Sequence, residues 1–245
     1  MQKQLHPNIS VDCVIFGFDF EKLNVLLVER TYLHPETKEV IFSDYTLAGN
    51  HVYVDENLVD AAKRVLNNLT GLDNIYLEQF YAPEDPGRLL KKNDQLWLKK
   101  EGKNPEERVV SVCYFSLLNC KEVSIQKKDR NVDWHPISEI RNLGFDHDII
   151  LAQALKSLQV KLQNEPIGYE MLPLKFTLSQ LQKLYEVVFD MEFDKRNFRK
   201  KVSKMKYLIQ LDEKQKGVSH KPARYYIFSR DVYEKTKSDI LNFSV

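Results

Sequence analysis

The stretch Asn50–Leu72 reads NHVYVDENLVDAAKRVLNNLTGL, and it decides how the surrounding chain is expected to fold. Its apolar side chains recur at the three- and four-residue spacing of one helical face: Leu58, Ala61, Ala62, Val65, Leu66 and Leu69. Asp55 or Asn57 can cap the start of this helix, and Gly71 can end it. The stretch therefore predicts an amphipathic helix with one face on a core.

Upstream of this helix, two apolar runs rich in β-branched residues predict a hairpin. They are VDCVIFGFDF at Val11–Phe20 and LNVLLVER at Leu23–Arg30, joined by a short polar turn. Residues Thr31–Ser43 are predicted to be a loop, and Tyr45–Leu47 a short strand that leads into the helix.

Downstream, the pattern predicts alternating strands and loops and then a second helix. Asn74–Tyr81 is expected to be a strand, and Val109–Leu118 is continuously apolar, as in a central strand. The polar segment Ala82–Arg108 is predicted to be a loop of the length that is usually functional or mobile. Within it, Trp97 either packs locally or stacks on a sugar or base. Val132–Trp134 is a candidate strand, and His147–Leu162 has helical periodicity and closes the first domain.

A domain boundary is predicted near residue 165, because Asn164–Lys175 contains Pro166, Gly168 and Pro173. We therefore expect two domains, residues 1–164 and residues 165–245.

The second domain shows the pattern of a winged helix-turn-helix. Thr177 and Gln180 have the spacing of a capping box, and apolar residues continue that helix to Val188. After the turn at Asp190–Phe193, Asp194 can cap a second, basic helix that is predicted to reach about Lys206. The segments Tyr207–Leu211 and Arg224–Phe228 are expected to be strands of a wing, whose tip carries Lys214, Gly217 and His220.

Charge is distributed unevenly along a chain whose net charge is only +1. Between Asp194 and Arg224 there are 11 Lys or Arg residues against 3 acidic residues, which points to a polyanionic partner. In the order helix, turn, basic helix and basic hairpin, this favours double-stranded DNA. The predicted DNA-contacting residues are Lys195, Arg196, Asn197, Arg199, Lys200, Lys204, Lys206, Lys216, Lys221 and Arg224. Which of them read bases is left open.

Composition predicts a globular, cytoplasmic protein. The longest run without a charged residue, Val109–Cys120, has 12 residues, fewer than the roughly 20 that span a bilayer. The N-terminus has no apolar segment of the kind found in secretion signals. Cys13, Cys113 and Cys120 lie in apolar runs without metal-ligand spacing, so buried free thiols are expected.

The first domain resembles the Nudix family, because Glu56, Arg64, Leu66, Gly71 and Leu72 match the signature G-x5-E-x7-R-E-U-x-E-E-x-G-U. In Nudix hydrolases, three glutamates of that signature hold the magnesium that activates water. Here those positions are Val65, Asn68 and Leu69. Because hard divalent cations need clustered oxygen ligands, we expect no catalytic residues, no metal, no cofactor and no hydrolase activity.

The whole chain resembles the NrtR-type family of Nudix-related transcriptional regulators. The most specific phrases are LPLKFTLSQLQKLYE, DKRNFRKKV and KPARYYIF, with FDH at Phe145–His147 and RVVSV at Arg108–Val112 in support. The resemblance implies an α+β fold: an N-terminal Nudix-like α/β/α sandwich with a mixed sheet, followed by a C-terminal winged helix-turn-helix. It further implies a homodimer that binds double-stranded DNA as a repressor or an activator, of which we expect a repressor, with no membrane partner. One winged helix rarely supplies enough affinity alone, so the operator is expected to be palindromic.

The effector is expected to bind the Nudix-like domain. Family members with an intact signature are associated with ADP-ribose and NAD metabolism, whereas branches with an eroded signature are linked to sugar catabolism. The chain looks closest to the arabinose-responsive AraR branch of Bacteroidetes, so a pentose, L-arabinose, is the expected effector. The candidate ligand-binding residues are Arg30, Tyr45, Asn50, His51 and Glu56, with Asp146 and His147 as further candidates. Arg64 either braces Glu56 or contacts ligand, and His147 either starts a helix or contacts ligand.

Two other functions stay open. A residual Nudix hydrolase would recruit carboxylates from elsewhere, such as Glu78, Glu106 or Glu107. A single-stranded nucleic-acid binder would stack bases on aromatic side chains such as Tyr207, Tyr225 and Tyr226.

Overall fold

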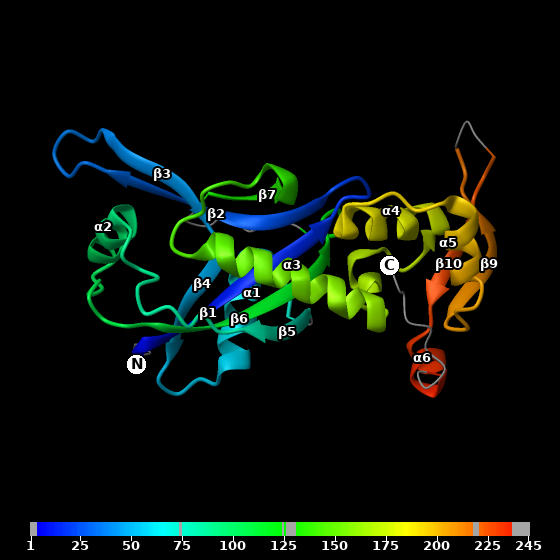
Figure 1. Cartoon of the computed structure of the whole chain (residues 1–245), viewed down its shortest axis with the longest axis horizontal. Helices are drawn as coiled ribbons and strands as arrows, with labels where there is room; N and C mark the ends of the chain where they lie inside the picture. The colour runs from blue at the N-terminus through cyan, green and yellow to red at the C-terminus, as the bar shows by residue number, and fades with distance from the viewer. Residues whose placement is uncertain (1–3, 74, 124, 126–130, 218–220, 237–245) are drawn as a thin grey trace.

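The computed structural model describes residues 4–73, 75–123, 125, 131–217 and 221–236. In this part of the chain, the N-terminal domain is built on one seven-stranded sheet and the C-terminal domain carries a three-stranded sheet (Figure 1). The strands of the large sheet are β1 (Leu5–Phe18), β2 (Leu23–Leu33), β3 (Val40–Thr46), β4 (Ala48–Tyr53), β5 (Tyr76–Tyr81), β6 (Val110–Asn119) and β7 (Val132–Pro136).

Strand β1 is the centre of the large sheet. It pairs antiparallel with β2 and β4 and parallel with β6, so the sheet is mixed. The predicted hairpin is confirmed by the β1–β2 register, in which Phe16 lies opposite Val25. The prediction that Val109–Leu118 forms a central strand is confirmed as well, because β6 lies between β1 and β5.

Alternation along β1 divides its side chains between two cores. Val14 and Phe16 belong to the core on the side of helix α3 (His147–Asn164), and Cys13 and Ile15 belong to the core on the side of helix α1 (Leu58–Thr70). Since successive strand residues point to opposite faces, each helix covers one face of the sheet. The expected α/β/α sandwich is confirmed.

Helix α1 is the helix predicted from the stretch Asn50–Leu72. Asn57 caps it, because the Asn57 Oδ1 accepts a hydrogen bond from the backbone N–H of Asp60 at 2.9 Å. Gly71 ends it with φ 72°, a left-handed conformation that a residue without a Cβ adopts at no steric cost. The buried face includes Ala61, Val65 and Leu66.

Two predicted loops were wrong. Within Thr31–Ser43, β2 continues to Leu33 and β3 begins at Val40, because the two strands pair and the Tyr32 ring stacks on Phe42 at 5.7 Å. The short strand that we predicted at Tyr45–Leu47 is the end of β3, and a separate strand, β4, follows it from Ala48. Within Ala82–Arg108 lies helix α2 (Lys92–Lys100), which the largely charged sequence did not reveal.

The C-terminal domain is a winged helix. It contains the short 3-10 helix η2 (Ile167–Met171), β8 (Phe176–Thr177), α4 (Leu178–Phe189), α5 (Lys195–Val202), β9 (Leu208–Lys214), β10 (Arg224–Phe228) and α6 (Arg230–Thr236). Strand β10 lies between β8 and β9, and the wing tip includes Gly217, whereas His220 lies outside the described residues. The capping box at Thr177 and the Asp194 cap are confirmed, but α5 ends at Val202 rather than near Lys206.

The two domains share one hydrophobic core. The cluster that begins under the sheet at Phe16 continues through Leu158 and Leu162 of α3 to Leu184 and Val188 of α4. Gln159 of α3 also donates a hydrogen bond to the Val188 carbonyl at 2.8 Å. The winged helix is therefore packed directly on α3, and Figure 1 shows α3 running along the sheet toward it.

Candidate functional site

The basic face of helix α5 is the first candidate site. Phe198 and Val202 are buried and fix one side of the helix against the core, so the opposite side faces solvent. The structure leaves all the predicted DNA-contacting side chains exposed: Lys195, Arg196, Asn197, Arg199, Lys200, Lys204, Lys206, Lys216, Lys221 and Arg224. The first five lie on α5, Lys204 and Lys206 follow it, and the last three lie on or next to the wing.

A buried hydrogen-bond clamp sets the turn between α4 and α5. The Gln182 side-chain amide donates to the Phe193 carbonyl at 2.9 Å and to the Glu186 carboxylate at 2.8 Å. That carboxylate in turn accepts from the Phe193 N–H at 3.2 Å. Because both backbone groups of Phe193 are held by α4, the direction in which α5 leaves the turn is fixed. This positioning was not foreseen from the sequence.

The aromatic residues proposed for single-stranded binding serve the fold. Tyr207 is 9% exposed, and its ring packs edge-on against Phe228 and Tyr233. Tyr225 and Tyr226 lie half-buried in β10, where the Tyr226 hydroxyl donates to Gln210 on the neighbouring strand at 2.8 Å. Strand pairing and packing thus account for the tyrosines, and base stacking on them is disfavoured.

The second candidate site is a cavity of about 670 Å³ in the N-terminal domain. Its volume lies within the roughly 300–1,000 Å³ of typical small-molecule sites. The walls come from β1, β4, α1 and the segment that contains α2. Arg30, Asn50 and His51 line it, as does His147, so the structure brings these predicted ligand residues together.

Three predicted ligand residues do not line this cavity: Tyr45, Glu56 and Asp146. Tyr45 is 38% exposed and its ring packs on His135, with centroids 4.5 Å apart. Glu56 accepts two hydrogen bonds from Arg64, at 2.8 and 2.7 Å, while Arg64 also donates to the His51 carbonyl. The bracing role considered for Arg64 is therefore the one that the geometry shows.

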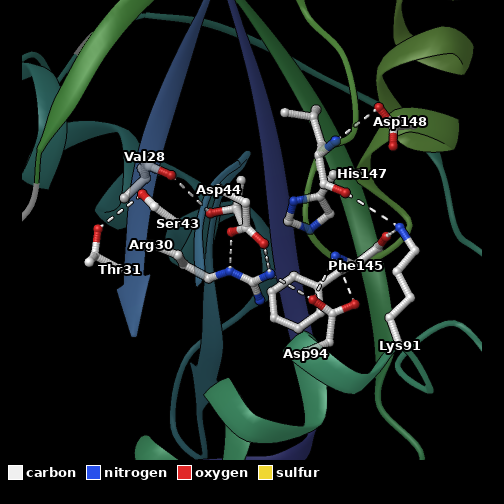
Figure 2. A network of polar contacts seen from close by, with 12 residues as sticks. Val28, Arg30, Thr31, Ser43, Asp44, Lys91, Asp94, Phe145, His147 and Asp148 are labelled. Carbon is white, nitrogen blue, oxygen red and sulfur yellow. Dashed lines mark hydrogen bonds and ion pairs between the residues drawn. The ribbon is translucent and has the colours of Figure 1, made fainter. Parts of the chain in front are cut away.

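Arg30 sits in a buried cluster of charge and aromatic rings (Figure 2). Its guanidinium donates to both carboxylate oxygens of Asp44, at 2.7 and 2.6 Å, and to Asp94 at 2.7 Å. The rings of Phe42, Trp97 and Phe145 lie 5.4, 5.6 and 4.5 Å from it. Burial alone lowers the pKa of Arg30, but the two carboxylates raise it above its ordinary value, so the charge is retained.

Arg88 forms a second buried cluster that sequence analysis missed. Its guanidinium donates to both Asp146 oxygens, at 2.9 and 2.7 Å, to Asp12 at 3.3 Å, and to the Ser111 hydroxyl. Burial raises the pKa of Asp12, but the opposing effect of His147 and Arg88 leaves it below its ordinary value. Asp146, a further ligand candidate, is therefore engaged by Arg88.

Together, the two arginine clusters fasten the segment containing α2 to the rest of the domain. Asp94 lies on α2 and Arg88 precedes it, while their partners come from β1, β2, β3 and the start of α3. Trp97 on α2 packs on Arg30, so the local packing considered for it is confirmed. Trp97 also lines the cavity, and its stacking on a sugar or base stays a prediction. The segment Ala82–Arg108, predicted to be a loop, therefore forms part of the cavity wall and is held there by the two arginine clusters.

His147 is a buried neutral imidazole at the start of α3. Its Nδ1 accepts a hydrogen bond from the Leu47 N–H at 2.9 Å, so the ring proton lies on Nε2, 3.8 Å from Asp12. Burial lowers the pKa of His147. Burial and the nearby Lys103 lower the pKa of His51 as well.

The pKa of His147 predicts a loss of stability in acid. A base whose folded pKa is depressed stabilises the fold fully above its unfolded pKa of 6.5 and loses that contribution as pH falls below it. Between pH 7 and 5, His147 should make the unfolding free energy of the wild type fall by up to about 1.4 kcal/mol per pH unit. We expect His147→Gln to lack this part of the fall. His51 leaves a residual decline. Urea titrations across this range would show it, with His34→Gln as the control, and an unchanged decline in His147→Gln would contradict the assignment.

The three positions at which the Nudix signature has its metal-binding glutamates lie in the cavity wall. Val65, Asn68 and Leu69 line the cavity from α1. Within the described residues there is no group of three or more His, Cys, Asp or Glu side chains arranged to hold a metal ion. Glu78, considered as a substitute carboxylate, pairs with Lys161 of α3 at 3.0 Å, and neither it nor Glu106 or Glu107 lines the cavity.

The cysteines take no part in either site. Cys13 and Cys113 are buried free thiols, as predicted, and Cys120 is a free thiol of intermediate exposure. Burial raises the pKa of Cys120 to about 12.

No helix in the described part of the chain is both long and apolar enough to span a bilayer.

Comparison with known proteins matches both halves of this architecture. Residues 168–228 match the family model of the NrtR DNA-binding winged helix domain. The ADPR responsive transcriptional repressor NtrR of Acinetobacter baylyi is 28% identical over an alignment of 233 residues, and the match covers 93% of this chain and 84% of that protein. The crystal structure of Shewanella oneidensis NrtR complexed with a 27mer DNA superposes with a TM-score of 0.71 at 26% identity, covering 92% of this chain and 95% of that one.

A more distant likeness concerns the fold alone. A MutT/nudix family protein from Enterococcus faecalis superposes with a TM-score of 0.67 at 21% identity, over 91% of this chain and 88% of that chain.

Fold and sites together define a class of protein in which a Nudix-like α/β domain is joined to a DNA-binding winged helix. Within that class, this chain is similar to the NrtR-type regulators, which are the Nudix-related winged-helix proteins of the matched domain model and the solved structure. The comparisons do not single out the arabinose-responsive branch that we expected from the sequence.

Proposed function

We propose that this protein is a transcriptional repressor whose winged helix binds a DNA operator and whose Nudix-like cavity binds an effector that changes operator affinity. The observation that carries the proposal is the 670 Å³ cavity at the former metal site, in the same chain as an exposed basic helix α5. Similarity to the A. baylyi repressor supports the regulatory role.

On DNA, helix α5 would enter the major groove and the wing would lie along the phosphate backbone. Arginine can pair with guanine and asparagine with adenine, so Arg196, Asn197 and Arg199 are the proposed base-reading residues. The lysines of the wing would bind phosphate, which makes affinity fall with salt. One winged helix offers few contacts, so we propose a homodimer on a palindromic operator, with residues 1–164 supplying the dimer contact.

The first candidate effector is ADP-ribose. The A. baylyi relative is named for its response to this nucleotide, and the cavity is larger than a single pentose requires. Arg30 Nη1 is a buried donor without a hydrogen-bond partner among the described residues, and Asn50 and His51 line the same cavity. We propose that these three side chains contact the effector.

L-arabinose is the second candidate, because Val65 and Leu69 replace the carboxylates that hold magnesium on a diphosphate in Nudix hydrolases. For the same reason we propose that the cavity binds its effector without hydrolysis, so no AMP should be released from ADP-ribose in the presence of Mg²⁺. Sustained AMP release would revive the hydrolase alternative.

Calorimetric titration of the full chain, first with ADP-ribose and then with L-arabinose, tests the cavity. We expect one of them to bind the wild type, and Asn68→Trp to weaken that binding at least about tenfold because an indole at this position fills the cavity. Val59→Trp is the matched control, since Val59 is on the same helix, 44% exposed and outside the cavity lining. Binding that Asn68→Trp leaves unchanged would place the effector elsewhere, and no binding of either compound would remove both candidates.

A further inference from the structure

The short turn before α3 holds two side-chain-bearing residues in the left-handed region of backbone conformation. Asn142 has φ 54° and Phe145 has φ 56°. This conformation is unfavourable for residues with a Cβ, and for a bulky aromatic residue it persists only where neighbouring groups hold it. Asn142 is exposed, whereas Phe145 is half-buried and its ring lines the cavity.

The contacts that hold Phe145 come from the segment containing α2 and from Arg30 of β2. Both carboxylate oxygens of Asp94 accept from the Phe145 N–H, at 3.0 Å each, and Lys91 donates to the Phe145 carbonyl. The Arg30 guanidinium lies over the ring (Figure 2). An occupant of the cavity that touches the ring, or that draws Arg30 away from Asp94, therefore changes the forces on this strained residue.

Phe145 is also connected to the DNA-binding domain. Asp146 and His147 follow it directly and begin α3, which at 18 residues is roughly 27 Å long. Towards the far end of α3, Gln159 bonds to the Val188 carbonyl, and the Leu162 carbonyl accepts a hydrogen bond from Tyr185 of α4. A helix is stiff over this length, so a rotation at its first turn reaches α4 and, through the clamped turn, α5.

We infer that Phe145 is the positioning residue that transmits occupancy of the cavity to the winged helix. In this inference, the ring of Phe145 contacts the effector. The backbone of Phe145 switches between the left-handed conformation and another one, and this change alters the direction of α3. The inference rests on the proposed function, because it names the residue through which the effector would change operator binding. It predicts that a protein without this ring no longer changes its operator affinity even when its cavity is saturated with effector.

The test compares Phe145→Gly with Asn142→Gly in the full chain. Glycine adopts positive φ without strain at both positions, but only the first substitution removes a ring from the cavity. Calorimetry measures binding of ADP-ribose and of L-arabinose, and fluorescence anisotropy measures affinity for a labelled operator duplex with and without each compound.

For Phe145→Gly we expect weaker effector binding, because a ring is lost from the cavity wall, and effector-free operator affinity within about threefold of wild type. At effector concentrations that saturate each protein, the effector-induced change in operator affinity should be below about twofold in Phe145→Gly, against the roughly 5- to 150-fold typical of coupled sites. Asn142→Gly should keep the wild-type response. A full response in saturated Phe145→Gly would overturn the inference, and so would a complete loss of effector binding by this variant or an equal loss of response in Asn142→Gly. If the wild type itself binds no effector or no operator, the proposed function has failed instead.

Discussion

Replacing Arg30 with methionine is expected to lower the free energy of unfolding by about 3–5 kcal/mol, because it leaves two carboxylates without their buried cation. Asp94 is only 1% exposed in its side chain and Asp44 is 18% exposed, so water cannot solvate the first and only partly reaches the second. The substitution also removes the guanidinium that packs against Phe145 and Trp97. Urea unfolding followed by circular dichroism measures the loss.

Two further variants separate the buried pair from a general effect of losing a cation. Lys22→Met breaks an ion pair with Glu139 in which both side chains are more than half exposed, and it should leave stability close to wild type. Adding Asp94→Asn to Arg30→Met should recover part of the loss, because the amide oxygen can still accept from the Phe145 N–H. If Arg30→Met were as stable as Lys22→Met, the cluster would not be what holds α2 in place.

Alanine at Arg196 or at Arg199 is expected to weaken specific operator binding by about 1–3 kcal/mol each, or roughly 5- to 150-fold, if each side chain reads a base. Both side chains are exposed on α5, so the fold should be unaffected. Anisotropy titrations at one fixed salt concentration measure the change. A scrambled duplex in the same titration distinguishes base contacts from phosphate contacts, since the latter weaken both duplexes alike.

Lys156→Ala is the matched control for these variants, because Lys156 is an exposed basic residue on α3 rather than on the winged helix. It should leave operator affinity unchanged. Wild-type affinity in both the Arg196 and the Arg199 variants would exclude α5 as the recognition helix.

Local sequence signals were sufficient wherever a single segment determines its own structure. The apolar stripe of α1, the Asn57 cap and the left-handed Gly71 all act within one helix, so they could be read from residues 50–72. The helices of the winged helix could be predicted as well, because the residue types of the Thr177 capping box and the Asp194 cap mark where they start. The end of α5 was misplaced, since basic residues continue past Val202. The first strand of the wing was predicted to end at Leu211, but β9 runs to Lys214.

The cavity wall was not predictable, because it depends on contacts between residues that lie far apart in the chain. Helix α2 carries few apolar side chains, and its anchor Asp94 meets Arg30 across 64 positions. Arg88 reaches Asp12 across 76 positions and Asp146 across 58. A single sequence shows these residues only as members of a polar segment, so their pairing into two buried clusters required the structure.

Only some of the predicted ligand residues line the cavity, again because their placement depends on contacts between distant parts of the chain. Arg30, Asn50 and His51 line the cavity, whereas Tyr45 and Glu56 are directed into contacts with His135 and Arg64. The candidates were chosen because they lie near the Nudix signature in the sequence, and this choice pointed to the right part of the domain. It could not show which side chains of β3 and β4 point inward, because the register of β3 against β2 was not known.

The central claim is that operator binding is controlled from the Nudix-like cavity, and one titration tests it most directly. Fluorescence anisotropy of the full chain on labelled duplexes from the DNA upstream of its own gene, at fixed salt, would be repeated with ADP-ribose and with L-arabinose. The account predicts sequence-specific binding over a scrambled duplex, and a change of about 5- to 150-fold with ADP-ribose, or with L-arabinose if the second candidate holds. Binding that neither compound alters, or that does not distinguish the duplexes, would contradict it.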